Sequence, residues 1–509
     1  MSSTTSRIIQ NTGWLYAKMA ITMFLTLYTT RLILSGLGAS DFGIYNIVGS
    51  SIAMLGFINA ALSATTQRFM NYAEGEGDHT KKISIFNVSI VLHFAIACIM
   101  GAILICSGII IFKWVLNIPE DRQIAAQIVY GCLLLSTIFD VMTVPYVAVL
   151  NSHENMRYFA LIGVFEAFLK LAVAYVCLWS SQDKLVVYGF LMMVIPVTTL
   201  TIMRVYCHKH YNECKLAIRQ YFRKEIAFKM SSFAGWTFFY TVTSMVTLYG
   251  VNIIVNHFFG VIVNAAHGIA MQLSGMLMAF SSNAQKAYNP ILTKSEGAHD
   301  RNRMIYISLF GCRISYYLFG IFSIPVILLM PEILTIWLKE VPEWAVIFCR
   351  LQLVRILLEQ LVISLVSAIN AEGNIREYSL VRSIISILPI PLAYIAFLWG
   401  YPPYWMYIIW IICWAIIAGL ATIYYSKIIV SIPITFYCKQ VLFPCSLLTI
   451  ISILPNALAI IFAPNNNFQL LAVIIQIIVF SIGGIYLILK QEERIKLLSF
   501  AKKIVNNKP

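Results

Sequence analysis

The stretch SIFNVSIVLHFAIACIMGAILICSGIIIF, residues 84–112, decides the fold, because it contains no Asp, Glu, Lys or Arg. About 20 consecutive apolar residues are enough to cross the hydrocarbon core of a bilayer as one α-helix. Inside hydrocarbon, only a helix or a closed barrel satisfies every backbone N–H and C=O group. The stretch therefore predicts a transmembrane helix.

The rest of the chain has the same character. Of its 509 residues, 60% are hydrophobic and 11% are charged, whereas about 25% of the residues are charged in an average soluble domain. This is too little charge to cover a soluble fold of this length with a solvated surface. The composition excludes a soluble protein and predicts an all-α polytopic membrane protein.

Fourteen stretches are long and apolar enough to be membrane spans. They cover residues 12–35, 43–66, 84–112, 124–150, 159–180, 186–206, 231–258, 261–282, 304–330, 344–369, 380–400, 403–425, 441–462 and 468–489. The apolar run after Arg7 is too long for the apolar region of a signal peptide, so we expect the first span to be retained.

The basic residues predict the orientation of these spans. The chain has 36 Lys and Arg residues and a formal net charge of +14. Of these bases, 24 lie in connections on the side of the N-terminus and four on the other side, namely Lys113, Arg122, Lys184 and Lys339. Basic connections stay in the cytoplasm, so we expect both termini there. The basic character then reflects topology and does not indicate a nucleic-acid partner.

The connections between the spans are short. The longest covers residues 207–230, on the cytoplasmic side, and none is large enough for a soluble catalytic domain. The sequence contains no Walker A motif, HExxH motif or dinucleotide-binding fingerprint, which are the motifs of ATP, zinc and nucleotide chemistry. We therefore expect a protein that is not an enzyme and that uses no cofactor.

Cysteine and histidine give little support for a metal site. The eleven cysteines are scattered without a CxxC pair, and most lie in apolar stretches, where cysteine behaves as a small buried side chain. Cys207, His208, His210 and Cys214 are close in sequence and have metal-binding side chains. Their position favours a mixed polar loop edge, and the sequence predicts no metal site.

A repeat divides the chain into two halves. TGW at residues 12–14 corresponds to AGW at 234–236, TLY at 26–28 recurs at 247–249, and Gly38 aligns with Gly260. Six spans separate the copies, so both halves have the same orientation, as in the parallel repeats of some transporters. We expect an N-terminal six-helix half at 1–206, a cytoplasmic connecting loop at 207–230, a C-terminal six-helix half at 231–426, and two extra helices with a basic cytoplasmic tail at 427–509.

Eight bases lie inside the spans, where each charge costs about 2.5 to 3.5 kcal/mol on an insertion scale. Lys18 and Arg31 are close to the two ends of the first span. They are 13 positions apart, so a straight helix directs them about 220° apart. Each either snorkels to the membrane surface or faces a substrate cavity.

Five further bases belong to later spans. Arg313, Arg350 and Arg355 are deep enough to hold an anion in a cavity, whereas Arg204 and Arg382 lie at inner ends and are expected to snorkel. The candidates for binding an anion are therefore Lys18, Arg31, Arg313, Arg350 and Arg355.

Three acids in the spans are candidates for coupling. Glu166 and Lys170 are spaced i,i+4, as are Arg355 and Glu359, which predicts ion pairs on one helix face. Each pair is either structural or contains a carboxylate that is released when a substrate phosphate takes over the base. Asp140 has no base in reach on its own helix. In a site without water its protonated form would be favoured, and Asp140 could then carry a proton.

Short words in both halves carry a family resemblance. They are NTGWLYAKM at residues 11–19, LYTTR at 27–31, LGASDFGIYN at 37–46, TQRF at 66–69, GVNIIVNHFFG at 250–260, VNAAHGIA at 263–270 and NPILTKS at 289–295. They resemble bacterial polysaccharide-export flippases of the Wzx type, in the multidrug/oligosaccharidyl-lipid/polysaccharide exporter superfamily.

The resemblance implies a flippase in the bacterial inner membrane. Its substrate would be an undecaprenyl-diphosphate-linked oligosaccharide, a repeat unit of O-antigen, capsule or exopolysaccharide, moved from the cytoplasmic to the periplasmic leaflet by alternating access. The implied partners are this lipid-linked glycan, membrane lipids, H⁺ or Na⁺, and the glycan polymerase machinery.

The resemblance also implies roles for particular residues. Lys18 and Arg31 would contact the diphosphate, and the last two spans would form a groove for the lipid tail. His267 stands where we expect relatives often to have Arg. A neutral imidazole there would weaken the contribution of the C-terminal half to anion binding.

Two alternatives remain open. A multidrug cation antiporter of the same superfamily would favour acidic residues in its cavity, whereas bases outnumber acids in the spans of this chain. A membrane-embedded polysaccharide polymerase or glycosyltransferase would need a sizeable extracytoplasmic loop, and the chain has none.

Overall fold

The computed structural model describes residues 2–53, 55–115, 118–338, 340–462, 466–491 and 493–495. Every regular element in these ranges is a helix, so the protein is all-α, as predicted. Lys339, the connection at 463–465 and the predicted basic tail at 496–509 lie outside the described residues.

The chain forms two compact units. The N-terminal unit comprises residues 13–238 and 297–299, and the C-terminal unit comprises residues 1–12, 239–296 and 300–509. The segment predicted as the connecting loop, 207–230, is thus part of the N-terminal unit.

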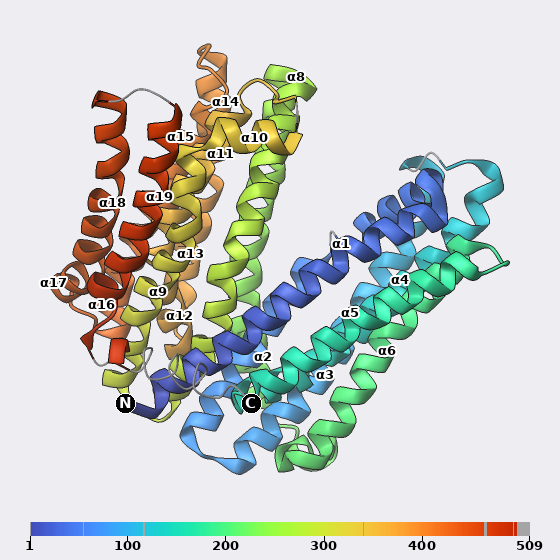
Figure 1. Ribbon diagram of the computed structural model, residues 1–509. Helices are drawn as coiled ribbons and strands as arrows, with labels where there is room; N and C mark the ends of the chain where they lie inside the picture. Colours follow the sequence, from blue (N-terminus) through green and yellow to red (C-terminus); the bar gives the residue numbers. More distant parts are fainter. Residues whose placement is uncertain are drawn as a thin grey trace, which may run out of the picture. The chain divides into compact units, whose positions relative to one another are not determined.

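The N-terminal unit is built around α4, which contacts α2, α3, α5 and α6 (Figure 1). A Cβ added to Gly189 of α6 would lie 2.9 Å from Val129 of α4, so this glycine allows the two helices to pack closely. The elements are α1 (Ser2–Ala53) from residue 13 on, α2 (Gly56–Glu76), α3 (His79–Ile110), η1 (Ile111–Val115), η2 (Glu120–Arg122), α4 (Gln123–Ser152), α5 (Met156–Trp179), α6 (Lys184–His210), η3 (Asn212–Cys214), α7 (Ile218–Tyr221) and the start of α8 (Lys224–Gly297).

The C-terminal unit contains the rest of α8 and a set of helices that surround α9. α9 contacts α11, α12 and α19, and α19 lies beside α18 (Figure 1). The elements are α9 (Arg301–Leu328), α10 (Met330–Leu338), α11 (Ala345–Gln360), α12 (Ile363–Glu372), α13 (Arg376–Ile387), α14 (Pro389–Leu398), α15 (Trp405–Trp410), η4 (Ile411–Ile417), α16 (Ala418–Val430), α17 (Ile434–Tyr437), η5 (Cys438–Leu442), α18 (Phe443–Phe462), α19 (Asn466–Gly483) and η6 (Gly484–Ile488).

Within the described residues, 11 helices are long and apolar enough to cross a membrane, or 12 if the bent pair Ser40–Ala53 and Gly56–Glu76 is one span. The protein is therefore a polytopic membrane protein, as predicted. This count takes α8 once and omits the predicted span 344–369. Two predicted spans, 231–258 and 261–282, lie on either side of Gly260, where a kink separates two helices within the element α8 (Lys224–Gly297). The predicted span 344–369 is divided between α11 and α12, and its charged residues lower its hydropathy.

The two halves begin with the same break in the backbone. α1 contains a non-helical residue at Gly38, with φ 77° and ψ 168°, and α8 contains one at Gly260, with φ 77° and ψ −173°. This region of backbone conformation is essentially restricted to glycine. The glycines that the sequence repeat aligns therefore share a conformation that few other residues adopt.

Candidate functional site

Lys18 lies against α5 in the N-terminal unit. Its Nζ is 4.3 Å from the centre of the Phe159 ring. A Cβ added to Gly163 would lie 2.1 Å from Lys18 Cε, so the lysine stem occupies the space that this glycine leaves on α5. Any larger residue at position 163 would therefore displace the end of the Lys18 side chain.

The face of α5 that holds Lys18 continues into an ion pair. Phe159, Gly163, Glu166 and Lys170 are spaced i, i+4, i+7 and i+11, which places them on one helix face. Lys170 Nζ is 2.7 Å from Glu166 Oε1, so the predicted pair is confirmed.

This pair lines a polar cavity together with Asp140 of α4. The cavity has a volume of about 280 Å³, and its walls come from α1, α4, α5 and α6. Its uncharged polar lining consists of Tyr45, Ser136, Thr137 and Thr199. Two predicted coupling residues, Asp140 and Glu166, are thus brought together across two helices, which helical spacing alone does not reveal.

The charges of the cavity are unequal. When Asp140, Glu166 and Lys170 are all ionised, two carboxylates face one ammonium group. A surplus charge away from bulk water is costly unless it is neutralised. One proton or one monovalent cation would balance the cavity, which makes cation exchange the chemistry that this arrangement suits.

Arg31 does not join this cavity. α1 is helical without interruption from Lys18 to Arg31, because its break comes later, at Gly38. The two side chains therefore lie about 220° apart round the helix. Lys18 is half-buried and Arg31 is exposed.

Arg355 is enclosed by partners inside the C-terminal unit. Its Nη1 is 2.5 Å from Glu359 Oε1, which confirms the second predicted pair, and its Nε donates to Gln352 Oε1 at 3.1 Å. Its guanidinium carbon lies 5.5 Å and 5.3 Å from the ring centres of Trp410 and Trp414. These contacts hold the planar guanidinium group in one orientation.

His267 lies beside this cluster. Its Nδ1 is 2.7 Å from the Tyr407 hydroxyl, and its ring centre is 5.6 Å from that of Trp410. Arg355 and His267 also interact electrostatically. A positively charged side chain, Arg355 of α11, is thus present near His267.

Arg382 also belongs to this cluster, although the sequence predicted that it would snorkel to the membrane surface. Its Nη2 donates to the Tyr240 hydroxyl at 2.9 Å, its guanidinium carbon lies 5.3 Å from the Tyr240 ring centre, and it interacts electrostatically with Glu359. Its partners are on α8 and α11, so spacing along α13 gives no signal for them. Arg355, Arg382 and Glu359 together carry a surplus of one positive charge.

Arg350 and Arg313 both donate hydrogen bonds to backbone carbonyl groups. Arg350 Nε donates to the carbonyl of Ile327 at 2.9 Å, at the C-terminus of α9, where carbonyls lack helical partners. Arg313 Nη1 donates to the carbonyl of Ile488 at 2.8 Å, and its Nη2 lies 3.2 Å from Glu493 Oε1. The Arg313 and Glu493 side chains are only 4% and 1% exposed.

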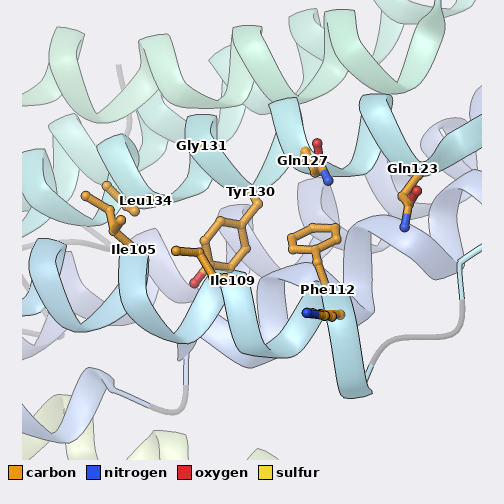
Figure 2. A pocket seen from close by; sticks show the side chains of 10 residues that line it. Ile105, Ile109, Phe112, Gln123, Gln127, Tyr130, Gly131 and Leu134 are labelled. Atoms are coloured by element: carbon orange, nitrogen blue, oxygen red, sulfur yellow. The ribbon is translucent and has the colours of Figure 1, made fainter.

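A larger cavity lies between α3 and α4 and contains none of the predicted site residues. Its volume is about 580 Å³. Figure 2 shows Ile105, Ile109, Phe112, Tyr130 and Leu134 around it, with Gln123 and Gln127 toward one end. Its largely apolar walls suit a hydrocarbon chain better than an ion.

Comparison with known proteins bears on the fold. No family model and no curated protein matches the chain. A crystal structure of MATE in the bent conformation has a TM-score of 0.71 at 12% identity and covers 84% of this chain and 95% of its own. An outward-facing multidrug resistance MATE transporter of the MOP superfamily has a TM-score of 0.70 at 13% identity and covers 84% and 95%.

The chain has the fold of MATE transporters. A MOP superfamily transporter from Pyrococcus furiosus is similar to the same extent, with a TM-score of 0.69 at 13% identity over 84% of this chain and 95% of its own. Reverse polarity of the binding pocket suggests a different function for that protein. These structures belong to transporters and not to enzymes.

Proposed function

We propose that the protein is a flippase for an undecaprenyl-diphosphate-linked oligosaccharide in the bacterial inner membrane, with both termini in the cytoplasm. The transporter fold supports the general class. The observation that carries the specific proposal is the base-rich cluster of Arg355, Arg382 and Glu359. A diphosphate that leaves water needs paired bases, and this cluster has one base in surplus.

Arg355 has the geometry to receive a phosphate group. Its guanidinium plane is already fixed by Trp410, Trp414 and Gln352, so little side-chain entropy is lost on binding. A phosphate oxygen would replace the Glu359 carboxylate on the same guanidinium edge. Glu359 would then be released to bind a proton or to pair with Arg382.

The other predicted bases differ in what they contribute. Lys18 and Arg31 supply further positive charge along α1 and are proposed to meet the diphosphate at different stages, because they point in different directions. The contacts of Arg313 and Arg350 with backbone carbonyls favour structural roles for both.

Coupling is proposed to use the cavity of Asp140, Glu166 and Lys170. Its surplus negative charge would be balanced by H⁺ or Na⁺ in one conformation and exposed in the other. The lipid tail would follow α18 and α19, with membrane lipids alongside, and the released product would pass to the glycan polymerase machinery.

A multidrug cation antiporter is the second candidate. The acidic surplus of the Asp140 cavity favours it, because an organic cation is attracted to paired carboxylates. Under this alternative Arg355 would be a structural residue.

Complementation distinguishes the two candidates. Cells that lack their polysaccharide flippase are given the wild-type gene, Arg355→Ala, Arg355→Lys or Lys18→Ala, and glycan export is measured. We expect at least a tenfold loss for Arg355→Ala, and a smaller loss for Arg355→Lys, which keeps the charge. Arg219→Ala, in the cytoplasmic segment, is the matched control. No restoration of export by the wild-type gene, together with efflux of organic cations from proteoliposomes, would establish the antiporter instead. Normal export by Arg355→Ala and Lys18→Ala would mean that neither side chain is needed to hold the diphosphate.

A further inference from the structure

Three metal-binding side chains meet at one end of the N-terminal unit. Glu74 comes from α2, His153 from the turn after α4, and Glu213 from η3. One ligand atom from each residue lies within 4.8 Å of the other two. The fold brings these three residues together from distant segments, and no sequence motif indicates the cluster.

The imidazole of His153 lies between the two carboxylates. Its Nε2 contacts Glu213 Oε1, and its Nδ1 is 3.7 Å from Glu74 Oε1. Its ring stacks on Tyr211, with ring centres 4.3 Å apart and an interplanar angle of 11°. Asn155 Nδ2 donates to the Tyr211 hydroxyl at 3.0 Å. The ring is thus held in a fixed orientation, as expected for a metal ligand.

Both carboxylates are also held in place. Lys82 Nζ is 2.8 Å from Glu74 Oε2, which leaves Oε1 directed toward His153. Glu213 lies in a segment anchored by Asn87, which donates to the carbonyl of Lys215 at 2.8 Å. The Glu213 side chain is 3% exposed and that of His153 is 24% exposed, so the site is enclosed but has an opening.

We propose that Glu74, His153 and Glu213 bind a divalent transition-metal ion, with Zn²⁺ as the reference ion. One imidazole nitrogen and two carboxylate oxygens are a ligand set that Zn²⁺ accepts at about 2.0 to 2.2 Å, with water in the fourth position. The ion would bind one of the two ring nitrogens of His153, and the carboxylate that contacts the other nitrogen would turn toward it. The bound ion would fasten the segment 207–223 to the ends of α2 and α4.

The structure favours these residues over the Cys207, His208, His210 and Cys214 group. The His208 ring packs on Phe86 and Tyr146 and the His210 ring stacks on Tyr206. Cys207 and Cys214 contact each other in the buried core, but the two histidines lie against other rings, so the four residues do not form one group.

Metal binding by the full-length protein tests the proposal. The protein is purified in detergent, treated with EDTA and titrated with ZnCl₂ by calorimetry, and tryptic cleavage within 207–223 is followed in parallel. We expect one Zn²⁺ per chain and slower cleavage when it is bound. Glu74→Gln, Glu213→Gln and His153→Asn should each weaken binding at least tenfold, whereas His210→Asn should bind as the wild type does.

A second measurement uses only the wild-type protein, so it does not depend on whether the variants fold. Co²⁺ bound to the wild-type protein should show the visible bands of a nitrogen and oxygen site, without the charge-transfer band of a thiolate ligand. No stoichiometric Zn²⁺ binding by the wild-type protein would overturn the proposal, and the cluster would then be an ion-pair network. A thiolate band, or loss of binding in His210→Asn alone, would overturn it in favour of the cysteine and histidine group.

Discussion

At the scale of single residues, the contact between Lys18 and Gly163 makes a position on α5 critical for a charge on α1. A Cβ on Gly163 would overlap the lysine stem. We therefore predict that Gly163→Ala displaces Lys18 and lowers glycan export nearly as much as Lys18→Ala does. Gly131→Ala on α4, where an added Cβ meets no atom within 4 Å, is the matched control. Wild-type export by Gly163→Ala would show that the position of Lys18 is unimportant.

The buried Arg313–Glu493 pair gives a second prediction. Glu493 Oε1 also accepts from the Tyr306 hydroxyl at 2.5 Å, and its Oε2 accepts from the backbone N–H of Lys490 at 2.8 Å. Removing one partner of a buried pair leaves an uncompensated charge, at a cost of about 3 to 5 kcal/mol. We predict this loss of stability for Glu493→Ala, measured by thermal unfolding in detergent.

The double variant separates this structural role from anion binding. Arg313→Met with Glu493→Leu removes both charges and should recover most of the stability lost in Glu493→Ala. If Arg313 only supports the fold, the double variant exports glycan. A stable double variant that does not export would assign Arg313 to the substrate.

At the scale of helices, Gly38 and Gly260 determine where the first helix of each half bends. An added Cβ would meet no atom within 4 Å at either position, so the cost of substitution comes from the backbone conformation. We predict that Gly38→Ala and Gly260→Ala each lower stability by about 1 to 3 kcal/mol. Thermal unfolding measures this loss, and Gly235→Ala, in a helical position with open space, should cause none. Unchanged stability in both variants would mean that the bends are not restricted to glycine.

These glycines also show how far the sequence could predict the fold. The repeat aligned Gly38 with Gly260 by spacing alone, and both have the same unusual φ. The sequence also predicted two separate spans that meet at Gly260, and the kink there separates two helices within α8. It did not predict that 344–369 is divided between α11 and α12, because hydropathy marks where a chain is apolar and not where its helix is interrupted.

The contacts of the candidate sites could be predicted from the sequence only in part. Both i,i+4 ion pairs were predictable, since each lies on one helix face. The approach of Arg382 to Tyr240, the cavity shared by Asp140 and Glu166, and the Glu74–His153–Glu213 cluster all depend on packing between helices. A single sequence carries no periodic signal for such packing.

Another prediction at this scale concerns the connection between helix ends in the N-terminal unit. Arg122 of η2 donates to Asp41 of α1 at 2.9 Å and to Asp183, before α6, at 2.7 Å. Burial raises the pKa of Asp183, but the hydrogen bonds from Arg122 and from the backbone of α6 outweigh it, and the pKa lies below its usual range.

The direction of this pKa shift defines the pH range in which the ion pair stabilises the fold. A carboxylate whose folded pKa is lowered stabilises the fold above its unfolded pKa, about 3.9, and loses this effect as the pH falls through the folded pKa. We predict that Arg122→Gln costs about 1 kcal/mol, since the pairs are partly exposed. Thermal unfolding should show the same loss of stability for Arg122→Gln at pH 8 and pH 5, and a smaller loss below pH 4. The control Lys209→Gln should lose no stability. A cost that already falls between pH 8 and pH 5 would contradict the assignment.

At the scale of the whole molecule, the two units carry clusters of opposite charge. The cluster of the N-terminal unit has two acids and one base, and that of the C-terminal unit has two bases and one acid. A transporter that couples an anionic substrate to a cation needs both kinds of site, since each ligand shifts the equilibrium only through its own differential binding.

Because the two clusters have opposite charges, we predict that variants in each cluster have different transport defects. In proteoliposomes, Asp140→Asn and Glu166→Gln should abolish the acceleration of lipid-linked glycan flipping by an imposed H⁺ or Na⁺ gradient, and leave slow downhill flipping intact. Arg355→Gln should lower flipping at least tenfold with or without a gradient, because it would remove the proposed contact with the substrate diphosphate. If Asp140→Asn and Arg355→Gln instead gave the same loss under both conditions, the clusters would not have separate roles, and the division of substrate and coupling ion between the two units would be wrong.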